Sequence, residues 1–92
     1  MIDASQIRAA RGLLNVSQAA LARMAFVHVA TIRRLETATE VRGSAETIWK
    51  IQSALDAAGV EFIAAEGGKG PGVRLKTVPG AAPKPKGKGA QR

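Results

Sequence analysis

The sequence predicts a mainly helical fold, with about four helices followed by a C-terminal β-hairpin and a basic tail. Apolar residues recur at spacings of three and four through residues 3–57, as in amphipathic helices, and alternate with polar residues after Gly59, as in strands. Ninety-two residues without cysteine make one small domain that lacks a disulfide. We expect this domain to span residues 1–76, with the hairpin at about residues 60–76, and the tail to span residues 77–92.

The first helix is expected to begin after Asp3 or Ser5 and to end near Leu13. Asp3 and Gln6 have the spacing of a capping box, in which each side chain satisfies the backbone N–H of the other residue. Three residues at helical spacing predict its inward face: Ile7, Ala10 and Leu14.

Residues 17–36 have the pattern of two short helices joined by a tight corner. Ser17 is a favourable N-cap for the earlier of the two, which we expect to direct Leu21 and Met24 inward. The later one is expected over residues 28–37, with Ile32 and Leu35 on one side. The opposite side of this later helix is formed by Ala30, Arg33, Arg34 and Thr37.

A fourth helix is expected after the polar loop TATEVRG, with Ser44 as its N-cap and Gly59 at its end. Trp49 lies beside its apolar stripe and is expected in the core or at a dimer interface. The stripe consists of Ile48, Ile51 and Leu55.

The alternation after Gly59 predicts a hairpin with one apolar face, formed by Val60, Phe62, Val73 and Leu75. Because an isolated hairpin is marginal in water, we expect this face to pack against the fourth helix or the hairpin edge to pair with a second chain. The glycine-rich segment EGGKGPG is its loop.

Charge points to an anionic partner. The chain has 14 Lys and Arg against 7 Asp and Glu, with a pI near 10.9, in the range of nucleic-acid binders. Residues 77–92 have almost nothing to bury and are expected to be disordered. Their cations Lys84, Lys86 and Lys88 suit non-specific contact with phosphates, although the tail is equally consistent with a solubilising end.

Several classes of protein are excluded by what the sequence lacks. No stretch approaches the roughly 18 apolar residues of a membrane span, and no basic segment with an apolar core opens the chain. We therefore expect a cytoplasmic protein without a membrane partner. No paired-carboxylate, Ser-His-Asp or metal-ligand constellation is present, and His28 is the only histidine, so we expect neither an enzyme nor a metal or other cofactor.

The stretch from Ser17 to Glu36 resembles the helix-turn-helix of the Cro and phage-repressor-like (XRE) transcription regulators. The residues that carry the resemblance are Gln18, Leu21, Ala22, Ile32, Leu35 and Glu36. The resemblance extends from Ile7 to Gly59. It implies a lambda-repressor-like bundle, and a bacterial or phage repressor that binds double-stranded DNA in the nucleoid as a homodimer.

The same resemblance implies where DNA would be bound. Arg33 and Arg34 can each donate two hydrogen bonds to guanine or bind phosphate. The alternative is that both belong to a solvated helix face with no role in binding. Val29 would contact a thymine methyl or lean into the core. Gln18 would bind phosphate, whereas Arg11 and Glu36 would form an internal ion pair. The full set of expected DNA contacts is Gln18, His28, Val29, Ala30, Thr31, Arg33, Arg34 and Thr37.

Three positions depart from the pattern of the family. Phe26 replaces the usual corner glycine, at a cost of about 1 to 2 kcal/mol in the left-handed conformation, so we expect either its burial or a different corner. Asn15 replaces a loop glycine, which is a mild change because Asn tolerates positive φ. His28 is a weak cap where Ser or Thr is usual.

Two other functions stay open. One is an antitoxin or antagonist that binds a protein partner through an apolar patch of Phe26, Val27 and Val29. The other is a nucleoid or RNA binder that depends on the basic tail, for which deletion of residues 77–92 would abolish binding.

Overall fold

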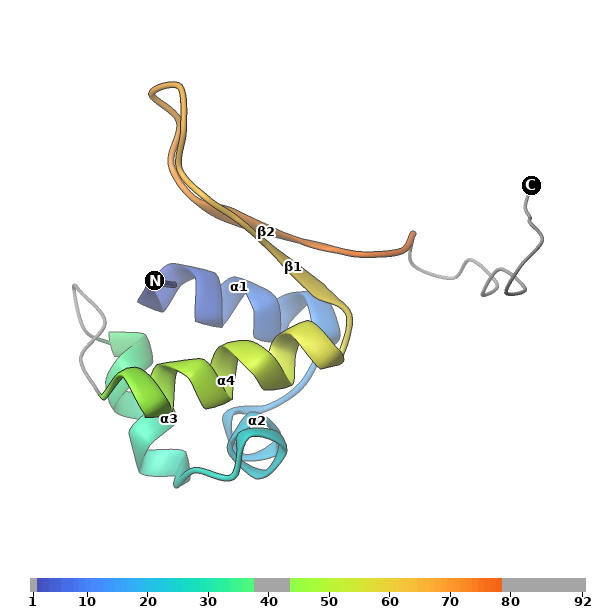
Figure 1. Cartoon of the computed structure of the whole chain (residues 1–92). Coiled ribbons are helices and arrows are strands. Elements are labelled where there is room, and N and C mark those ends of the chain that lie inside the picture. Colours follow the sequence, from blue (N-terminus) through green and yellow to red (C-terminus); the bar gives the residue numbers. More distant parts are fainter. Residues whose placement is uncertain (1, 38–43, 79–92) are drawn as a thin grey trace.

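The computed structural model describes residues 2–37 and 44–78, which form four helices and one antiparallel pair of strands. The elements are α1 (Ala4–Leu14), α2 (Gln18–Ala25), α3 (Val29–Thr37), α4 (Ala45–Ala57), β1 (Val60–Ile63) and β2 (Gly72–Leu75). The hairpin lies over α1 and α4, on the side of the bundle away from the corner between α2 and α3 (Figure 1). The predicted helical fold with a C-terminal hairpin is thus confirmed, whereas Lys84, Lys86 and Lys88 lie outside the described residues.

The predicted N-caps are present. The carboxylate of Asp3 accepts a hydrogen bond from the backbone N–H of Gln6 at 2.9 Å, and the Gln6 carboxamide oxygen accepts one from the backbone of Asp3 at 3.0 Å. The hydroxyls of Ser17 and Ser44 each accept from the backbone N–H three residues further on, at 3.0 and 3.1 Å. These bonds satisfy N–H groups that the first turn of a helix leaves without partners.

Positive φ angles end α1 and α4. Asn15 follows α1 in the left-handed conformation, with φ 57°, as its tolerance of positive φ predicts. Gly59 follows α4 with φ 108°, which a side chain would strain, and the hairpin begins directly after it.

The core lies between the helices and the hairpin. Its largest fully buried side chains are Ile7, Leu21, Ile32, Leu35, Ile48, Ile51, Leu55 and Val60. Met24 is only half-buried, and the smaller Ala22 and Ala25 fill the inner face of α2 instead. The prediction of a core position for Trp49 is wrong, because this side chain is 68% exposed.

The hairpin has the predicted register. Val60 faces Leu75 and Phe62 faces Val73, so that all four side chains share the inner face. This face packs on α4, as predicted, and also on α1, which the sequence pattern did not indicate.

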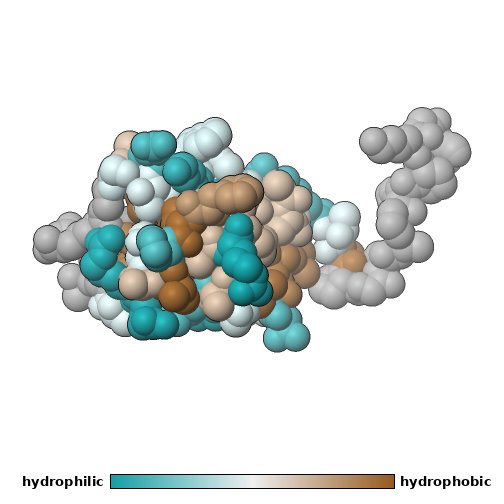
Figure 2. Space-filling view, turned by 90° about the horizontal axis from the view of Figure 1, so that it is seen from below, coloured by the Kyte–Doolittle hydropathy of each residue, from teal (hydrophilic) through white to brown (hydrophobic). Residues whose placement is uncertain are grey.

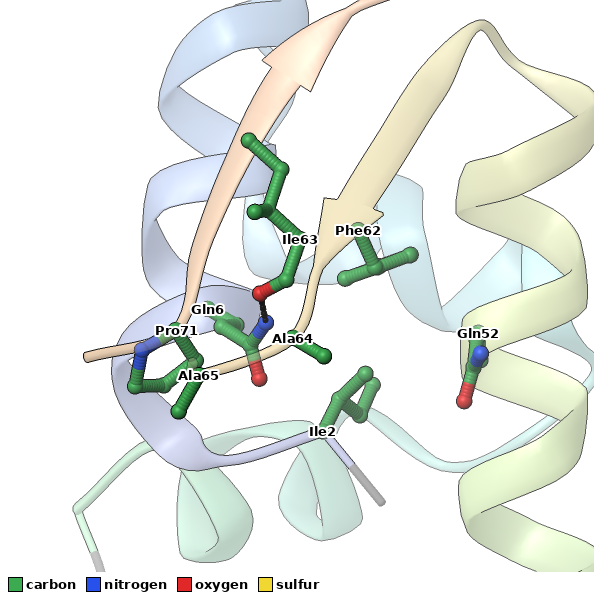
Figure 3. A pocket seen from close by; sticks show the side chains of 8 residues that line it. All are labelled: Ile2, Gln6, Gln52, Phe62, Ile63, Ala64, Ala65 and Pro71. Carbon is green, nitrogen blue, oxygen red and sulfur yellow. Dashed lines mark hydrogen bonds between the residues drawn. The ribbon is translucent and has the colours of Figure 1, made fainter. Parts of the chain in front are cut away.

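Gln6 connects the start of α1 to the end of the paired strands that is nearest the hairpin loop (Figure 3). Its side chain is buried, and its amide nitrogen donates to the backbone carbonyl oxygens of Gly72 at 3.0 Å and Ile63 at 3.5 Å. The same carboxamide therefore caps α1 through its oxygen and holds both strands through its nitrogen.

Within the described residues, no helix is long and apolar enough to cross a membrane.

Candidate nucleic-acid interface

The two sides of α3 differ completely in exposure. Ile32 and Leu35 are fully buried, and Glu36 is buried beside them. The opposite side consists of exposed residues: Ala30, Arg33, Arg34 and Thr37. The side of α3 that carries these four residues is thus open to solvent, while the other side anchors the helix to α1 and α2.

A buried carboxylate connects this helix to α1 and α2. Glu36 accepts hydrogen bonds from the Nε and Nη2 of Arg11 at 2.7 and 2.8 Å, and one from the Nε2 of Gln18 at 3.1 Å. Arg8 donates to the backbone carbonyl of Glu36. The internal ion pair that the resemblance implied is present. These polar contacts from α1 and α2 hold the C-terminal end of α3 in one orientation.

The electrostatics of this cluster keep Glu36 ionised. Burial raises the pKa of the Glu36 carboxyl, but the hydrogen bonds from Arg11 and Gln18 outweigh it and leave the pKa below its ordinary value. The hydrogen bond to Glu36 likewise raises the pKa of Arg11. The pair is therefore charged at neutral pH, with each charge compensated inside the protein.

Gln18 is the first residue of α2 and is half-buried. One hydrogen of its amide group is directed to Glu36, which fixes the side chain beside the open N-terminus of α2. A helix N-terminus carries unpaired backbone N–H groups and a partial positive charge that favour anions. The contact of Gln18 with phosphate stays a prediction, and its side chain has a structural partner in Glu36.

The corner between α2 and α3 is built on Phe26. This residue has φ 58° and ψ 47°, in the left-handed region, and its side chain is 87% exposed. Both alternatives expected from the sequence are wrong, because the corner keeps the left-handed conformation that usually requires glycine and Phe26 is not buried. The left-handed residue lets the backbone N–H of Val27 donate to the carbonyl of Ala22 at 3.0 Å, which closes the end of α2. Within the described residues, burial of the Phe26 ring does not offset the steric cost of the conformation, about 1 to 2 kcal/mol.

The start of α3 is less exposed than the rest of its outer face. The carbonyl of His28 accepts from the backbone N–H groups of Thr31 and Ile32 at 3.0 and 3.4 Å, while its imidazole is exposed. Val29 is half-buried and packs against the core, in agreement with the second of its two predicted roles. Thr31 is half-buried as well.

Apolar and charged side chains meet on the face of the molecule that holds this corner. Figure 2 shows apolar residues gathered in the middle of the face, with hydrophilic residues around them. Phe26 is the most exposed of the large apolar side chains in the described residues, and Val27 and Val29 beside it are half-buried. The exposed apolar patch predicted from Phe26, Val27 and Val29 therefore consists mainly of Phe26.

Sequence reasoning missed the contribution of Arg8. Arg8 and Arg11 lie three residues apart on α1, a spacing that places both on one side of a helix, and both reach Glu36. That spacing was the available signal. Its meaning depends on Glu36, which lies 28 residues after Arg8.

A family model described as "Helix-turn-helix" matches residues 7–62, which is more than half of the chain and includes all four helices except the first residues of α1. A comparison with curated proteins gives no match.

Proposed function

The chain belongs to the Cro/C1-type (XRE) helix-turn-helix family of DNA-binding regulators, and from this membership we propose that it represses transcription by inserting α3 into the major groove of an operator. The observation that supports this mode of binding is the exposed face of α3, with Arg33 and Arg34 at its middle. An α-helix fits the major groove, where arginine recognises guanine through two hydrogen bonds.

Contacts around α3 would position it on the duplex. Gln18 and the N-terminus of α2 would hold one phosphate, and His28 another, because Gln18 is held next to α3 by its bond to Glu36 and His28 directly precedes α3. Ala30 and Thr37 would lie against the bases, with Thr31 and Val29 at the edge of the contact. Lys84, Lys86 and Lys88 would add contacts to phosphate that do not depend on sequence.

The chain would act as a homodimer. A single domain of this size contacts few base pairs, whereas two copies related by a twofold axis read two half-sites one helical turn apart, about 34 Å. Specific interfaces with DNA bury about 1,000 to 2,500 Å² of protein surface, which a pair of such domains provides more readily than one.

An antitoxin or antagonist remains the second candidate, because Phe26 is strained and exposed at once. The half-burial of Val27 and Val29 weakens this candidate, since an apolar docking patch of three residues is reduced mainly to one. Co-purification of a stoichiometric protein partner, without binding of DNA by the purified chain, would favour it over the repressor.

The test begins with selection of bound duplexes from a random pool by the purified protein. Arg34→Ala should then weaken binding to the selected operator by about 1 to 3 kcal/mol and relax the preference for bases. Arg74→Ala is the matched control, because Arg74 is an exposed arginine on the hairpin, on the opposite side of the bundle from the corner that begins α3. Lys86→Ala should weaken all sequences alike and reduce the salt slope by about 1.

Two results would contradict the proposal. One is a pool from which no sequence is enriched. The other is an equal loss of affinity for operator and random duplexes in Arg34→Ala, which would remove the base-reading role from that residue.

A further inference from the structure

We propose that two copies of this chain associate through a groove that Phe26 and Trp49 border. This inference rests on the proposed function, because binding to a twofold operator requires two copies of the chain. The groove, called here the aromatic groove, has a volume of about 300 Å³ and lies between the end of α2 and the middle of α4. Its lining consists of Met24, Ala25, Phe26, Trp49, Lys50, Ser53 and Ala54.

The aromatic residues of the chain are few, and their placement is unusual. The sequence has two Phe, one Trp and no Tyr. Phe26 is 87% exposed and Trp49 is 68% exposed, and both line the same groove, whereas Phe62 packs against the core. Clustered exposure of large apolar side chains on a small soluble domain marks a surface that binds another molecule.

The backbone at Phe26 strengthens this argument. Asn15, at the corresponding end of α1, has nearly the same φ, 57° against 58°, and is a residue type that adopts it readily. Phe26 has no such tolerance and gains no burial within the described residues. Local strain that the fold does not compensate is a feature of functional sites, and burial of the ring against another chain would supply the missing compensation.

The occupant is identified as a second copy by the shape of the surface. One chain carries both a projecting ring, Phe26, and the groove beside it, so a twofold axis lets each copy place its ring in the groove of the other. Phe26 also precedes the first residue of α3 by three positions, so this contact keeps both α3 helices near the interface. The hairpin lies on the opposite side of the bundle (Figure 1), and association through it would move the two α3 helices apart.

Charge does not oppose association through this face. The chain has a net charge of +7, so most faces of two copies repel each other. On α4, next to the aromatic groove, Lys50 is balanced by Glu46 at 3.7 Å. A second groove, beside β2, is lined by Arg74 and Lys76, which pair with Glu61 at 3.1 Å and with Asp56 at 3.0 Å. Net charge is therefore compensated at both grooves, although charged side chains on an edge strand still oppose pairing with another strand.

The area available predicts a weak dimer. Aromatic side chains bury about 150 to 250 Å² each, so the exposed parts of Phe26 and Trp49 from two copies can bury roughly 500 to 800 Å² in total. Stable interfaces bury about 1,200 to 2,000 Å² in total. The half-buried neighbours supply part of the difference, and we expect dissociation constants on the order of micromolar or weaker.

Sedimentation velocity of the full chain between about 1 µM and 500 µM tests the proposal, across the affinity range expected of small interfaces. The wild type should shift from monomer to dimer. Phe26→Asn and Trp49→Ala should each raise the dissociation constant at least about 10-fold, because buried aromatic anchors dominate small interfaces. Val78→Ser is the matched control, since Val78 is 73% exposed outside the groove, and should leave the constant unchanged.

Phe26→Asn also separates loss of contact from loss of fold. Asparagine accepts the left-handed conformation, so the variant monomer should melt several degrees higher than the wild-type monomer. Weaker association together with a higher melting temperature cannot arise from unfolding.

The outcomes distinguish this inference from the proposed function. A wild type that stays monomeric at 500 µM overturns the inference and leaves the groove to a different protein. Dimers that persist unchanged in both variants overturn it too, and sequence-selective binding of DNA by those dimers would leave the proposed function standing. Conversely, dimers that the variants weaken as expected, in a protein that enriches no DNA sequence, support the inference and remove the proposed function.

Discussion

Replacement of Arg11 by Met tests whether the buried ion pair with Glu36 orients α3. The Glu36 side chain is 2% exposed and that of Arg11 is 23% exposed. Removal of one partner of a buried pair costs about 3 to 5 kcal/mol, because the other charge is left in the interior without compensation. Partial exposure of Arg11 and the remaining hydrogen bond from Gln18 reduce this cost, so we expect a loss of about 2 to 4 kcal/mol in the free energy of unfolding.

Urea unfolding at neutral pH measures this loss as a lower midpoint with an unchanged m-value. By heat, the melting temperature should fall by roughly 8 to 32 °C, since 1 kcal/mol corresponds to about 4 to 8 °C in a domain of this size.

The contribution of Glu36 to the pH dependence of stability should have opposite signs in the wild type and in Arg11→Met. In the wild type the pKa of Glu36 is lowered on folding, so its contribution is full above the ordinary value of 4.5 and disappears as the pH falls through the folded value. Without Arg11, we expect burial, the largest single cause, to outweigh the remaining effects of Gln18 and Arg8 and to raise the pKa of Glu36 above its ordinary value. In the variant, acidification through this raised pKa should therefore relieve part of the destabilisation.

Arg74→Met provides the matched control. Arg74 donates two hydrogen bonds to Glu61, at 3.1 and 3.2 Å, in the same two-pronged geometry, but both side chains are exposed. Solvent screens such a pair, so no resolved change in the urea midpoint is expected. Equal effects of Arg11→Met and Arg74→Met, or an unaltered slope with pH in Arg11→Met, would refute the reasoning.

Two further predictions concern the hairpin. Gln6→Ala removes a helix cap together with the hydrogen bonds to Ile63 and Gly72, so it should lower the free energy of unfolding by about 1 to 3 kcal/mol. Protection from hydrogen exchange should be lost first in β1 and β2. An equal loss of stability in Gln52→Ala, which alters the other wall of the same pocket, would contradict this prediction. Gly59→Ala should lower the free energy of unfolding by about 1 to 3 kcal/mol through backbone strain alone, because φ is 108° and the added methyl group meets no neighbour within 4 Å. An unchanged melting temperature would contradict this prediction and show that the turn relaxes.

Local signals in the sequence predicted most of the fold. Asp3, Ser17 and Ser44 mark three of the four helix starts, because their side chains satisfy N–H groups a few positions away, within reach of the same segment. The register of the hairpin follows from strict alternation, since a slip by one residue would turn Val60 and Leu75 to solvent. These predictions needed only short-range geometry.

The features that sequence reasoning missed depend on distant partners. Gln6 has the spacing of a capping residue, but its contact with Gly72 crosses 66 positions and no periodicity encodes it. Trp49 looked like a core residue because it adjoins the apolar stripe of α4, yet one position on a helix is a rotation of about 100°, enough to direct it to solvent. For Phe26, the low tolerance of a residue with a Cβ atom for positive φ indicated strain at the corner. The exposure of its side chain could be seen only in the folded structure.

The end of the hairpin offers a place to attach a reporter. Residues 63–71 are all exposed, and the turn is closed by the backbones of Glu66 and Lys69, with Gly67 and Gly68 between them at positive φ. Exposed turns of small residues accept inserted peptides well. A fluorescent label or short epitope placed between the two glycines would report on the protein in a cell extract while leaving α3 and the aromatic groove untouched.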